Sequence, residues 1–379
     1  MHNPSTDELF LRRALDLARQ GIGLTSPNPC VGAVIVDAKG TIVGEGSHTY
    51  DGLKHAEILA LEQAGEKARG ATLYVTLEPC SHQGRTGRCA DAVIAAGISK
   101  VIACMQDPNP QVNGSGFACL RAAGIEVSTG RLEDEAKRLN EAFAKYVRHK
   151  IPLITLKAAM TLDGKIAPPP SPSRPSHSQW ITGEPARAHV QELRHQSDAI
   201  LVGVGTVITD DPLLNDRSGR PRRRPLLRVV LDSRLRLPVT SRLVQTAQDD
   251  VLVLCSFAEE KKKKQLLKHG IRVEQLPKAT SDGHPDLAAI AHFLGEMEIT
   301  SLMIEGGATV NGAALASGIV DKVFFYYAPR IIGGTTSVPL AAGTGFAQIG
   351  DAPRIKCIRL HRFGEDFAVE GYLKDPYAD

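Results

Sequence analysis

Residues 72–89 have the sequence TLYVTLEPCSHQGRTGRC, in which an apolar segment leads through a Pro-Cys pair to a second cysteine. The first six residues are rich in β-branched and large apolar side chains, which predicts a buried strand. Cys80 therefore follows a strand, and Cys89 begins a segment that is predicted to be helical. Upstream, His55-Ala56-Glu57 lies at the start of another predicted helix. Chemically reactive side chains thus gather at the ends of predicted elements.

One imidazole and two thiolates match the needs of a catalytic zinc ion, which takes three protein ligands and keeps one position open for water. We predict that His55, Cys80 and Cys89 hold one Zn²⁺ per chain. The arrangement H-x-E with a later P-C-x-x-C is typical of zinc nucleobase deaminases, in which the glutamate moves protons and does not bind the metal. Glu57 is accordingly the predicted catalytic acid and base.

Each of these motifs alone has a more ordinary explanation. A single His-x-Glu on a helix is usually a surface pair, and two cysteines around a loop are more often buried thiols than ligands. The zinc could also be structural, but structural zinc usually has four protein ligands. His82, between the cysteines, is the candidate for a fourth ligand. The loop between Cys80 and Cys89 is also longer than the two residues of the common motif.

The length of 379 residues predicts two domains, because single hydrophobic cores usually stop growing at smaller sizes. A formal charge of +3 is too small to indicate a polyanionic partner by itself. We find no signal peptide and no apolar run long enough for a membrane span, so a cytoplasmic protein without a membrane partner is expected. Seven cysteines in such a chain argue against a disulfide framework.

Predicted strands and helices alternate along the chain, which indicates α/β layers. In the first part, strands are predicted at 31–36, 41–44, 72–77, 100–104 and 125–128, and helices at 9–18, 55–64, 89–96, 117–123 and 133–149. Ile151-Pro152 interrupts the pattern, and strands follow at 153–156, 199–202, 226–231, 251–254, 301–304 and 322–327. Residues 168–178 and 217–224 are predicted loops. We expect a boundary near residue 150, between domains 1–150 and 151–379.

Four segments of the first domain, PNPCVGAVIV, HAEILAL, YVTLEPCSHQGRTGRC and MQDPNPQVNGSG, resemble the zinc-dependent deaminases of riboflavin biosynthesis. The resemblance implies a cytidine-deaminase-like, three-layer α/β/α fold. It implies hydrolytic removal of the 2-amino group of 2,5-diamino-6-ribosylamino-4(3H)-pyrimidinone 5′-phosphate, a small phosphorylated pyrimidine. The positions that match substrate contacts of the family are Asn28, His48, Arg85, Asp107 and Asn109.

These five side chains have suitable chemistry for that substrate. Asn28, Asp107 and Asn109 can recognise donors and acceptors of a heterocycle, while His48 and Arg85 can meet a phosphate. The first three also precede prolines, and such pairs favour turns even without a ligand.

Two glycine clusters in the second domain each follow a predicted strand. Gly203-Val204-Gly205-Thr206 does not complete G-x-G-x-x-G, because residue 208 is Ile, so the Rossmann fingerprint is absent. Glu305-Gly306-Gly307 leads into a predicted helix, where backbone amides can face a diphosphate. Either cluster alone is more often a turn than a nucleotide site.

Five segments, LKAAMTLDGKIA, SQWITG, LVGVGTVITDDPLL, VVLDS and IEGGATVNGAAL, resemble the reductase of the same pathway, whose α/β fold is similar to dihydrofolate reductase. The resemblance implies NADPH as hydride donor and reduction of the ribosyl chain at C1′, which yields 5-amino-6-ribitylaminouracil 5′-phosphate. The matching coenzyme positions are Ala159, Trp180, Thr206, Asp210, Ser233, Gly307, Ala308, Thr309, Val310, Asn311, Gly312 and Ala313. The matching substrate positions are Lys157, Ser178, Arg194, Leu214, Arg217 and Glu305.

Arg194 and Arg217 suit a ribose phosphate, because a guanidinium can donate two parallel hydrogen bonds to it. The two resemblances together predict a bifunctional enzyme of riboflavin biosynthesis, and they imply a homodimer or a higher homo-oligomer. The alternative is a zinc deaminase that edits tRNA or another nucleic acid and carries an accessory C-terminal domain. Basic residues at 220–224 and 261–264 favour it, but no aromatic residues suited to base stacking lie among them, so no nucleic-acid partner is expected.

Overall fold

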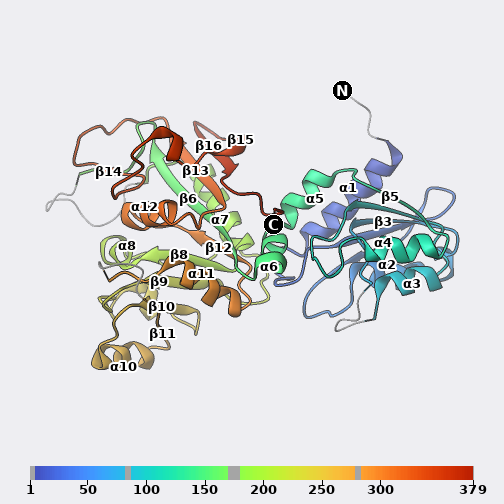
Figure 1. Ribbon diagram of the computed structural model, residues 1–379, viewed down its shortest axis with the longest axis horizontal. Helices are drawn as coiled ribbons and strands as arrows, with labels where there is room; N and C mark the ends of the chain where they lie inside the picture. Colours follow the sequence, from blue (N-terminus) through green and yellow to red (C-terminus); the bar gives the residue numbers. More distant parts are fainter. Residues whose placement is uncertain (1–4, 82–86, 170–179, 278–282, 379) are drawn as a thin grey trace. The chain divides into compact units, whose positions relative to one another are not determined.

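The computed structural model describes residues 5–81, 87–169, 180–277 and 283–378. The chain divides into two compact units (Figure 1). The first contains Met1–His149 and Pro221–Arg224, and the second contains Lys150–Arg220 and Pro225–Ala378. Among the described residues, no helix combines the length and the apolar character that a bilayer span requires.

The first unit is built on a sheet that has five strands within the described residues, in the order β2-β1-β3-β4-β5. These strands are β1 (Gly32–Val36), β2 (Ile42–Ser47), β3 (Thr72–Leu77), β4 (Lys100–Met105) and β5 (Glu126–Thr129). β1 and β2 form the predicted antiparallel hairpin, whereas β3, β4 and β5 are parallel. The carboxyl ends of parallel strands meet at one edge of a sheet. The segments that follow Leu77 and Met105 therefore lie at the same edge.

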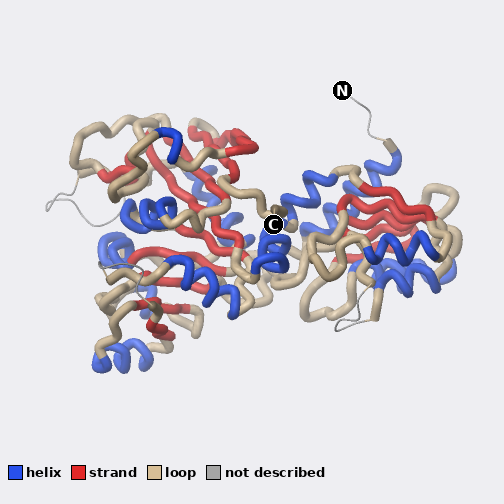
Figure 2. Tube along the Cα trace, viewed as in Figure 1, coloured by secondary structure: helices blue, strands red, loops and turns tan. Residues whose placement is uncertain are grey.

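The helices of the first unit alternate with these strands along the chain, and Figure 2 shows them (blue) beside the strands (red). They are α1 (Thr6–Arg19), α2 (Ala56–Ala64), α3 (Cys89–Ala95), α4 (Ser115–Ala122), α5 (Glu133–Leu139) and α6 (Glu141–His149), with a 3-10 turn η1 (Gly65–Ala68). The prediction of one helix over 133–149 was wrong, because the helix is interrupted at Asn140. The side-chain amide of Asn140 accepts a hydrogen bond from the Cys30 backbone N–H at 2.8 Å and donates to the Cys30 carbonyl at 3.1 Å. This tertiary contact outweighs the local helical pattern.

The second unit is built on a sheet of nine strands within the described residues, in the order β11-β10-β9-β8-β12-β6-β13-β16-β15. Its strands are β6 (Leu153–Thr161), β8 (Ala199–Gly203), β9 (Leu227–Leu231), β10 (Val251–Cys255), β11 (Arg272–Gln275), β12 (Ser301–Ile304), β13 (Lys322–Ala328), β15 (Lys356–Phe363) and β16 (Asp366–Tyr372). A separate pair, β7 (Lys165–Ala167) and β14 (Val338–Pro339), is antiparallel. From β11 to β13 the large sheet is parallel, and β16 and β15 are antiparallel.

The helices of the second unit connect the parallel strands (Figure 1). They are α7 (Glu184–Gln196), α8 (Val204–Asp210), α9 (Arg242–Gln245), α10 (Glu260–Lys268), α11 (Leu287–Glu296) and α12 (Ala308–Ala316), with a 3-10 turn η2 (Ile349–Asp351). The strand β10 is buried along its whole length, which explains its uninterrupted apolar sequence. The alternation of strands and helices confirms the predicted α/β class.

Candidate active sites

The three predicted zinc ligands lie together at the carboxyl edge of the first sheet. Cys80 follows β3, Cys89 is the first residue of α3, and His55 caps the start of α2. The Nδ1 atom of His55 lies 3.1 Å from Sγ of Cys89 and 3.6 Å from Sγ of Cys80. In a tetrahedral zinc site with bonds of about 2.0–2.3 Å, ligand atoms lie roughly 3.5 Å apart. The three donor atoms, all within 4.8 Å of one another, therefore fit a zinc ion.

The protonation of the two thiols also fits a metal site. Cys89 donates a hydrogen bond to Cys80, and this contact, together with that from His55, lowers the pKa of Cys80 well below its ordinary value. The same hydrogen bond raises the pKa of Cys89. Zinc binds thiolates, so binding of the metal would release the proton that remains on Cys89.

Glu57 lies in the first turn of α2, two residues after His55, and its side chain is almost completely buried. Burial raises the pKa of Glu57 to about 7. A carboxyl group with a pKa near neutrality can both take up and return a proton at neutral pH. Position and protonation therefore suit the proton transfer that the sequence predicts for this residue.

His48 lies next to the zinc ligand His55: the two rings meet edge to face, with their centroids 5.3 Å apart. Asn28 contacts His48 and therefore lies nearby. Both ring nitrogens of His48 are occupied. Nδ1 lies 3.0 Å from the Lys54 carbonyl and must donate to it, so Nε2 accepts from the side-chain amide of Asn28, also at 3.0 Å. Burial lowers the pKa of His48, which keeps the ring neutral. The hydrogen bond to Nε2 of His48 fixes the orientation of the Asn28 side-chain amide.

Asp107 and Asn109 follow β4 at the same edge of the sheet as Cys80. The Asp107 carboxylate accepts a hydrogen bond from the Asn109 backbone N–H at 2.8 Å, which closes a turn. Burial is the main cause that raises the pKa of Asp107 to about 7. Arg85 and the candidate fourth ligand His82 lie outside the described residues.

The second unit contains a cavity of about 1570 Å³ at the carboxyl ends of its parallel strands. Of the predicted coenzyme contacts, Ala159, Trp180, Thr206, Asp210, Ser233, Gly307, Ala308, Thr309, Val310 and Ala313 line this cavity. Of the predicted substrate contacts, Lys157, Arg194, Leu214, Arg217 and Glu305 also line it. Ser178 lies outside the described residues. Residues from β6, α7, α8, α12 and the segment that follows β12 are thus brought together around one space.

Asn311 and Gly312 do not belong to the described residues that line the cavity. The side chain of Asn311 is fully buried and donates to the Leu340 carbonyl at 2.9 Å. A Cβ atom on Gly312 would lie 1.7 Å from the Ala342 carbonyl oxygen. These two residues therefore face the segment that packs on the other side of α12.

A buried group of charges lies on the cavity wall. Arg194 donates from Nε to Oε1 of Glu305 at 2.8 Å and from Nη2 to Oε2 at 3.0 Å. The ammonium group of Lys157 lies 3.5 Å from Oε2 of the same carboxylate. Burial alone would raise the pKa of Glu305, but the charges of Arg194 and Lys157 outweigh it and hold the pKa at about 2. Glu305 is therefore a carboxylate at neutral pH.

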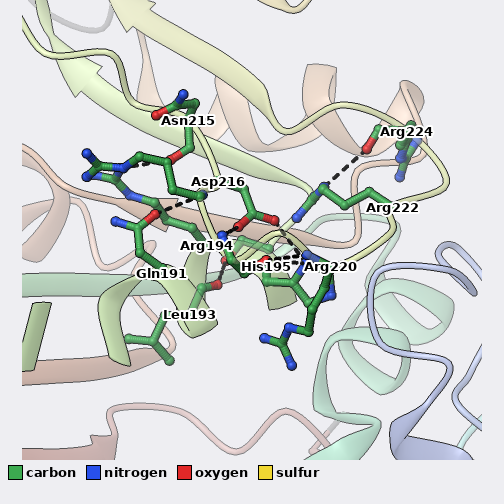
Figure 3. A network of polar contacts seen from close by, with 12 residues as sticks. Gln191, Leu193, Arg194, His195, Asn215, Asp216, Arg220, Arg222 and Arg224 are labelled. Carbon is green, nitrogen blue, oxygen red and sulfur yellow. Dashed lines mark hydrogen bonds and ion pairs between the residues drawn. The ribbon is translucent and has the colours of Figure 1, made fainter. Parts of the chain in front are cut away.

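Three side chains of α7 hold the loop that carries Leu214 and Arg217, and the sequence did not indicate this role. Figure 3 shows Gln191, Arg194 and His195 directed toward this loop. Arg194 donates to the Asn215 carbonyl at 3.0 Å, and Gln191 accepts from the Arg217 backbone N–H at 3.1 Å. His195, behind the cavity wall, contacts the Asp216 carboxylate at 2.9 Å. The spacing of three and four residues between Gln191, Arg194 and His195 places them on one face of α7, but this pattern does not show what they contact.

Two family models match the chain. Residues 4–105 match the cytidine and deoxycytidylate deaminase zinc-binding region, and residues 152–369 match the RibD C-terminal domain. The chain is 43% identical over 371 residues to riboflavin biosynthesis protein RibD of Actinobacillus pleuropneumoniae, which covers 98% of this chain and 96% of the relative. It is 42% identical to that of Escherichia coli K12, with 96% and 98% covered. The chain belongs to the RibD family.

Solved RibD structures agree with this assignment. A RibD structure from Acinetobacter baumannii has a TM-score of 0.83 and 36% identity, and covers 97% of this chain and 98% of its own. A second, from Thermotoga maritima, is described as a diaminohydroxyphosphoribosylaminopyrimidine deaminase/5-amino-6-(5-phosphoribosylamino)uracil reductase. Its TM-score is 0.81 at 36% identity, with 97% and 98% covered.

Membership of the RibD family makes the chain a bifunctional enzyme of riboflavin biosynthesis, a deaminase joined to a reductase. Its deaminase domain binds zinc, and its RibD reductase domain depends on NADPH. The expected cytidine-deaminase-like and dihydrofolate-reductase-like folds are confirmed. The RibD matches do not favour the tRNA-editing alternative.

Proposed function

We propose that the chain deaminates 2,5-diamino-6-ribosylamino-4(3H)-pyrimidinone 5′-phosphate at His55, Cys80, Cys89 and Glu57, and then reduces the ribosyl chain of the product in the cavity of the second unit. The observation that carries the proposal is the group of three donor atoms within 4.8 Å of one another, with the buried carboxyl of Glu57 on the same helix turn as His55. Residues 1–150 would carry the first activity and residues 151–379 the second.

Hydrolytic deamination needs a hydroxide and a proton for the leaving amine. Zinc, when bound, supplies a water molecule whose pKa is lowered to near neutrality. Glu57 would take a proton from the attacking water as its oxygen bonds to C2, and would deliver this proton to the 2-amino group, which leaves as ammonia when the C–N bond breaks. The buried position of Glu57 supports this role, because the proton stays out of bulk solvent during the transfer.

The substrate of the deaminase is held by the side chains around the metal. Asn28 contacts the heterocycle, and His48 acts on it by fixing the orientation of the Asn28 amide. Asp107 and Asn109 contact the substrate from the loop after β4, and Arg85 meets the phosphate. His48 itself is neutral and has both ring nitrogens in use, so it is assigned to orientation rather than to phosphate binding.

In the reductase, NADPH supplies the hydride for C1′ of the sugar. The backbone N–H groups of Gly307–Thr309, at the start of α12, would hold the diphosphate of the coenzyme. Arg217 meets the substrate phosphate, because its side chain is exposed to the cavity and its guanidinium has no ion pair with the described residues. Arg194 is committed to Glu305 and the Asn215 carbonyl. We therefore assign Arg194 to holding Glu305 and the loop that carries Leu214 and Arg217.

The family resemblance further supports a cytoplasmic homodimer or larger homo-oligomer. An assay of both reactions with purified enzyme tests the proposed activities. The diaminopyrimidine should release one equivalent of ammonia without coenzyme, and NADPH should be oxidised only after that release. NADPH oxidation without prior ammonia release would contradict the proposed order. No ammonia release by zinc-loaded enzyme would contradict the proposed substrate.

A further inference from the structure

Glu78 is the residue that follows β3 in the sequence, two positions before the zinc ligand Cys80. Its side chain is almost completely buried. Its charge is not balanced by a cationic side chain of the described residues. Instead, four backbone N–H groups donate to it. A buried carboxylate is tolerated only when hydrogen bonds replace its lost hydration, and charge-assisted bonds from N–H groups do this well.

The four donors come from the segment that follows β4. Oε2 of Glu78 accepts from the backbone N–H of Asp107 at 3.1 Å and of Gly114 at 2.9 Å. Oε1 accepts from the N–H of Gly116 at 2.8 Å and of Phe117 at 3.2 Å. One carboxylate thus holds Asp107 and Gly114, near the two ends of the loop between β4 and α4, and the first turn of α4.

A second contact joins the same two segments. A Cβ atom on Gly116 would lie 2.0 Å from the carbonyl oxygen of Pro79, the residue between Glu78 and Cys80. The first turn of α4 therefore packs directly against the segment that leads to the metal ligand. Movement of this loop relative to Cys80 would break both the hydrogen bonds to Glu78 and the packing of Gly116 against Pro79.

We propose that Glu78 is a positioning residue of the deaminase, which fixes the loop of Asp107 and Asn109 at a set distance from Cys80. The inference rests on the proposed function of Asp107 and Asn109 as contacts to the heterocycle. Glu78 touches neither the metal nor the substrate in this account. Glu78 acts through the backbone of the loop after β4. It holds the side chains of Asp107 and Asn109 where they can contact a pyrimidine bound at the zinc site.

The variant Glu78→Gln tests this role in the full-length, zinc-loaded enzyme. A glutamine keeps the size of the side chain but presents an NH₂ group to two of the four buried N–H donors, so the loop must shift. Misplacement of contact groups by about an ångström lowers kcat/KM by as much as about 100-fold. We expect an increase in the deaminase KM on the order of 10- to 100-fold, a smaller change in kcat, full zinc content and an unchanged reductase.

The matched control is Glu126→Gln, which removes an exposed carboxylate of the same unit that is paired with Lys100. It should leave both activities unchanged. A folded Glu78→Gln enzyme with the wild-type KM would overturn the proposal, and so would loss of zinc, which would assign Glu78 to support of the metal. The variant Asn109→Ala, in the same assay, separates the two claims. If it alone raises KM, only the Glu78 inference fails; if it leaves KM unchanged, the proposed substrate contact fails.

A second variant serves if Glu78→Gln does not accumulate as folded enzyme. Gly116→Ala retains the carboxyl group of Glu78, but its Cβ would lie 2.0 Å from the Pro79 carbonyl oxygen and 3.1 Å from Oε1 of Glu78, so the start of α4 must move away from both. It should raise the deaminase KM in the same range with zinc retained. A folded Gly116→Ala enzyme with wild-type deaminase kinetics would equally overturn the proposal.

Discussion

Arg194 and Glu305 join α7 to the end of β12 by two parallel hydrogen bonds, at 2.8 and 3.0 Å, on the wall of the reductase cavity. Both side chains are largely buried, and a buried pair of this kind becomes costly when one partner is removed. The pair also determines the charge of Glu305, since Arg194 and Lys157 together hold its pKa at about 2. Substrate binding and stability should both depend on it.

The variant Arg194→Ala should impair the reductase and leave the deaminase intact. It removes the contacts to Glu305 and to the Asn215 carbonyl, so the loop with Leu214 loses a support. Misplacement of Glu305 and of this loop by about an ångström predicts a fall in kcat/KM by as much as about 100-fold. Steady-state kinetics should show the change as a raised substrate KM. Weaker NADPH binding with an unchanged substrate KM would show that Arg194 lies in the coenzyme part of the cavity and not in the substrate part.

Arg217→Ala should weaken binding of the phosphorylated substrate, because its guanidinium, which forms no ion pair with the described residues, is the proposed phosphate contact. We expect a rise in the substrate KM by roughly tenfold or more, with little change in kcat. Arg220→Ala is the matched control, since Arg220 is exposed and is not among the described residues that line the cavity. The substrate without its phosphate should bind wild-type and Arg217→Ala enzyme equally. A loss that persists with that substrate would refute the phosphate contact.

The stability of the second unit should depend on pH through Glu305. Its pKa is about 2 in the folded chain against 4.5 ordinarily, so its contribution is complete above about pH 4.5 and is lost as pH falls toward 2. The shift corresponds to up to about 3 kcal/mol. Urea unfolding followed by Trp180, the single tryptophan, should show Glu305→Gln less stable than wild type at pH 7. The difference in unfolding free energy should shrink between pH 5 and 3. A constant difference over this range would contradict the ion-pair account.

Removal of either thiol ligand should abolish zinc binding and deamination together. Cys80→Ala and Cys89→Ala each leave two of the three protein ligands, too few for a catalytic site. Reduction of pre-deaminated substrate should persist, because the residues of that cavity lie elsewhere in the chain. Metal analysis and the two activity assays check this. Full zinc occupancy in both variants would disprove the ligand assignment.

The zinc constellation was predictable because its residues lie at the ends of strongly patterned elements. The strand over 72–77 has the predicted bounds, since every residue is apolar or β-branched and Glu-Pro follows. Chain topology then brings Cys80, Cys89 and His55 to one edge. The strands β15 and β16 were missed. In β15 the exposed side chains of Ile358 and Leu360 break the expected pattern of an outward polar face.

Other parts of the sites depend on contacts that no local pattern carries. The hydrogen bond between Asn28 and His48 and the backbone hydrogen bonds to the Glu78 carboxylate join residues far apart in the sequence. The burial of Asn311, in contrast, could have been anticipated. A helix with 3.6 residues per turn cannot direct seven consecutive side chains to one ligand. Residues 308–310 and Ala313 face the cavity, whereas Asn311 and Gly312 face away.

The most direct test of the central claim, that one chain carries a zinc deaminase with Glu57 as proton carrier and a separate reductase, is a comparison of Glu57→Gln with wild type. Ammonia release from the diaminopyrimidine and NADPH oxidation with the pre-deaminated substrate are measured on the same zinc-loaded preparation. We predict a fall in deamination by at least about 10²- to 10⁴-fold, the usual contribution of general acid–base catalysis, with full zinc content and unchanged reduction. Deamination at the wild-type rate by the Glu57→Gln enzyme would contradict the account.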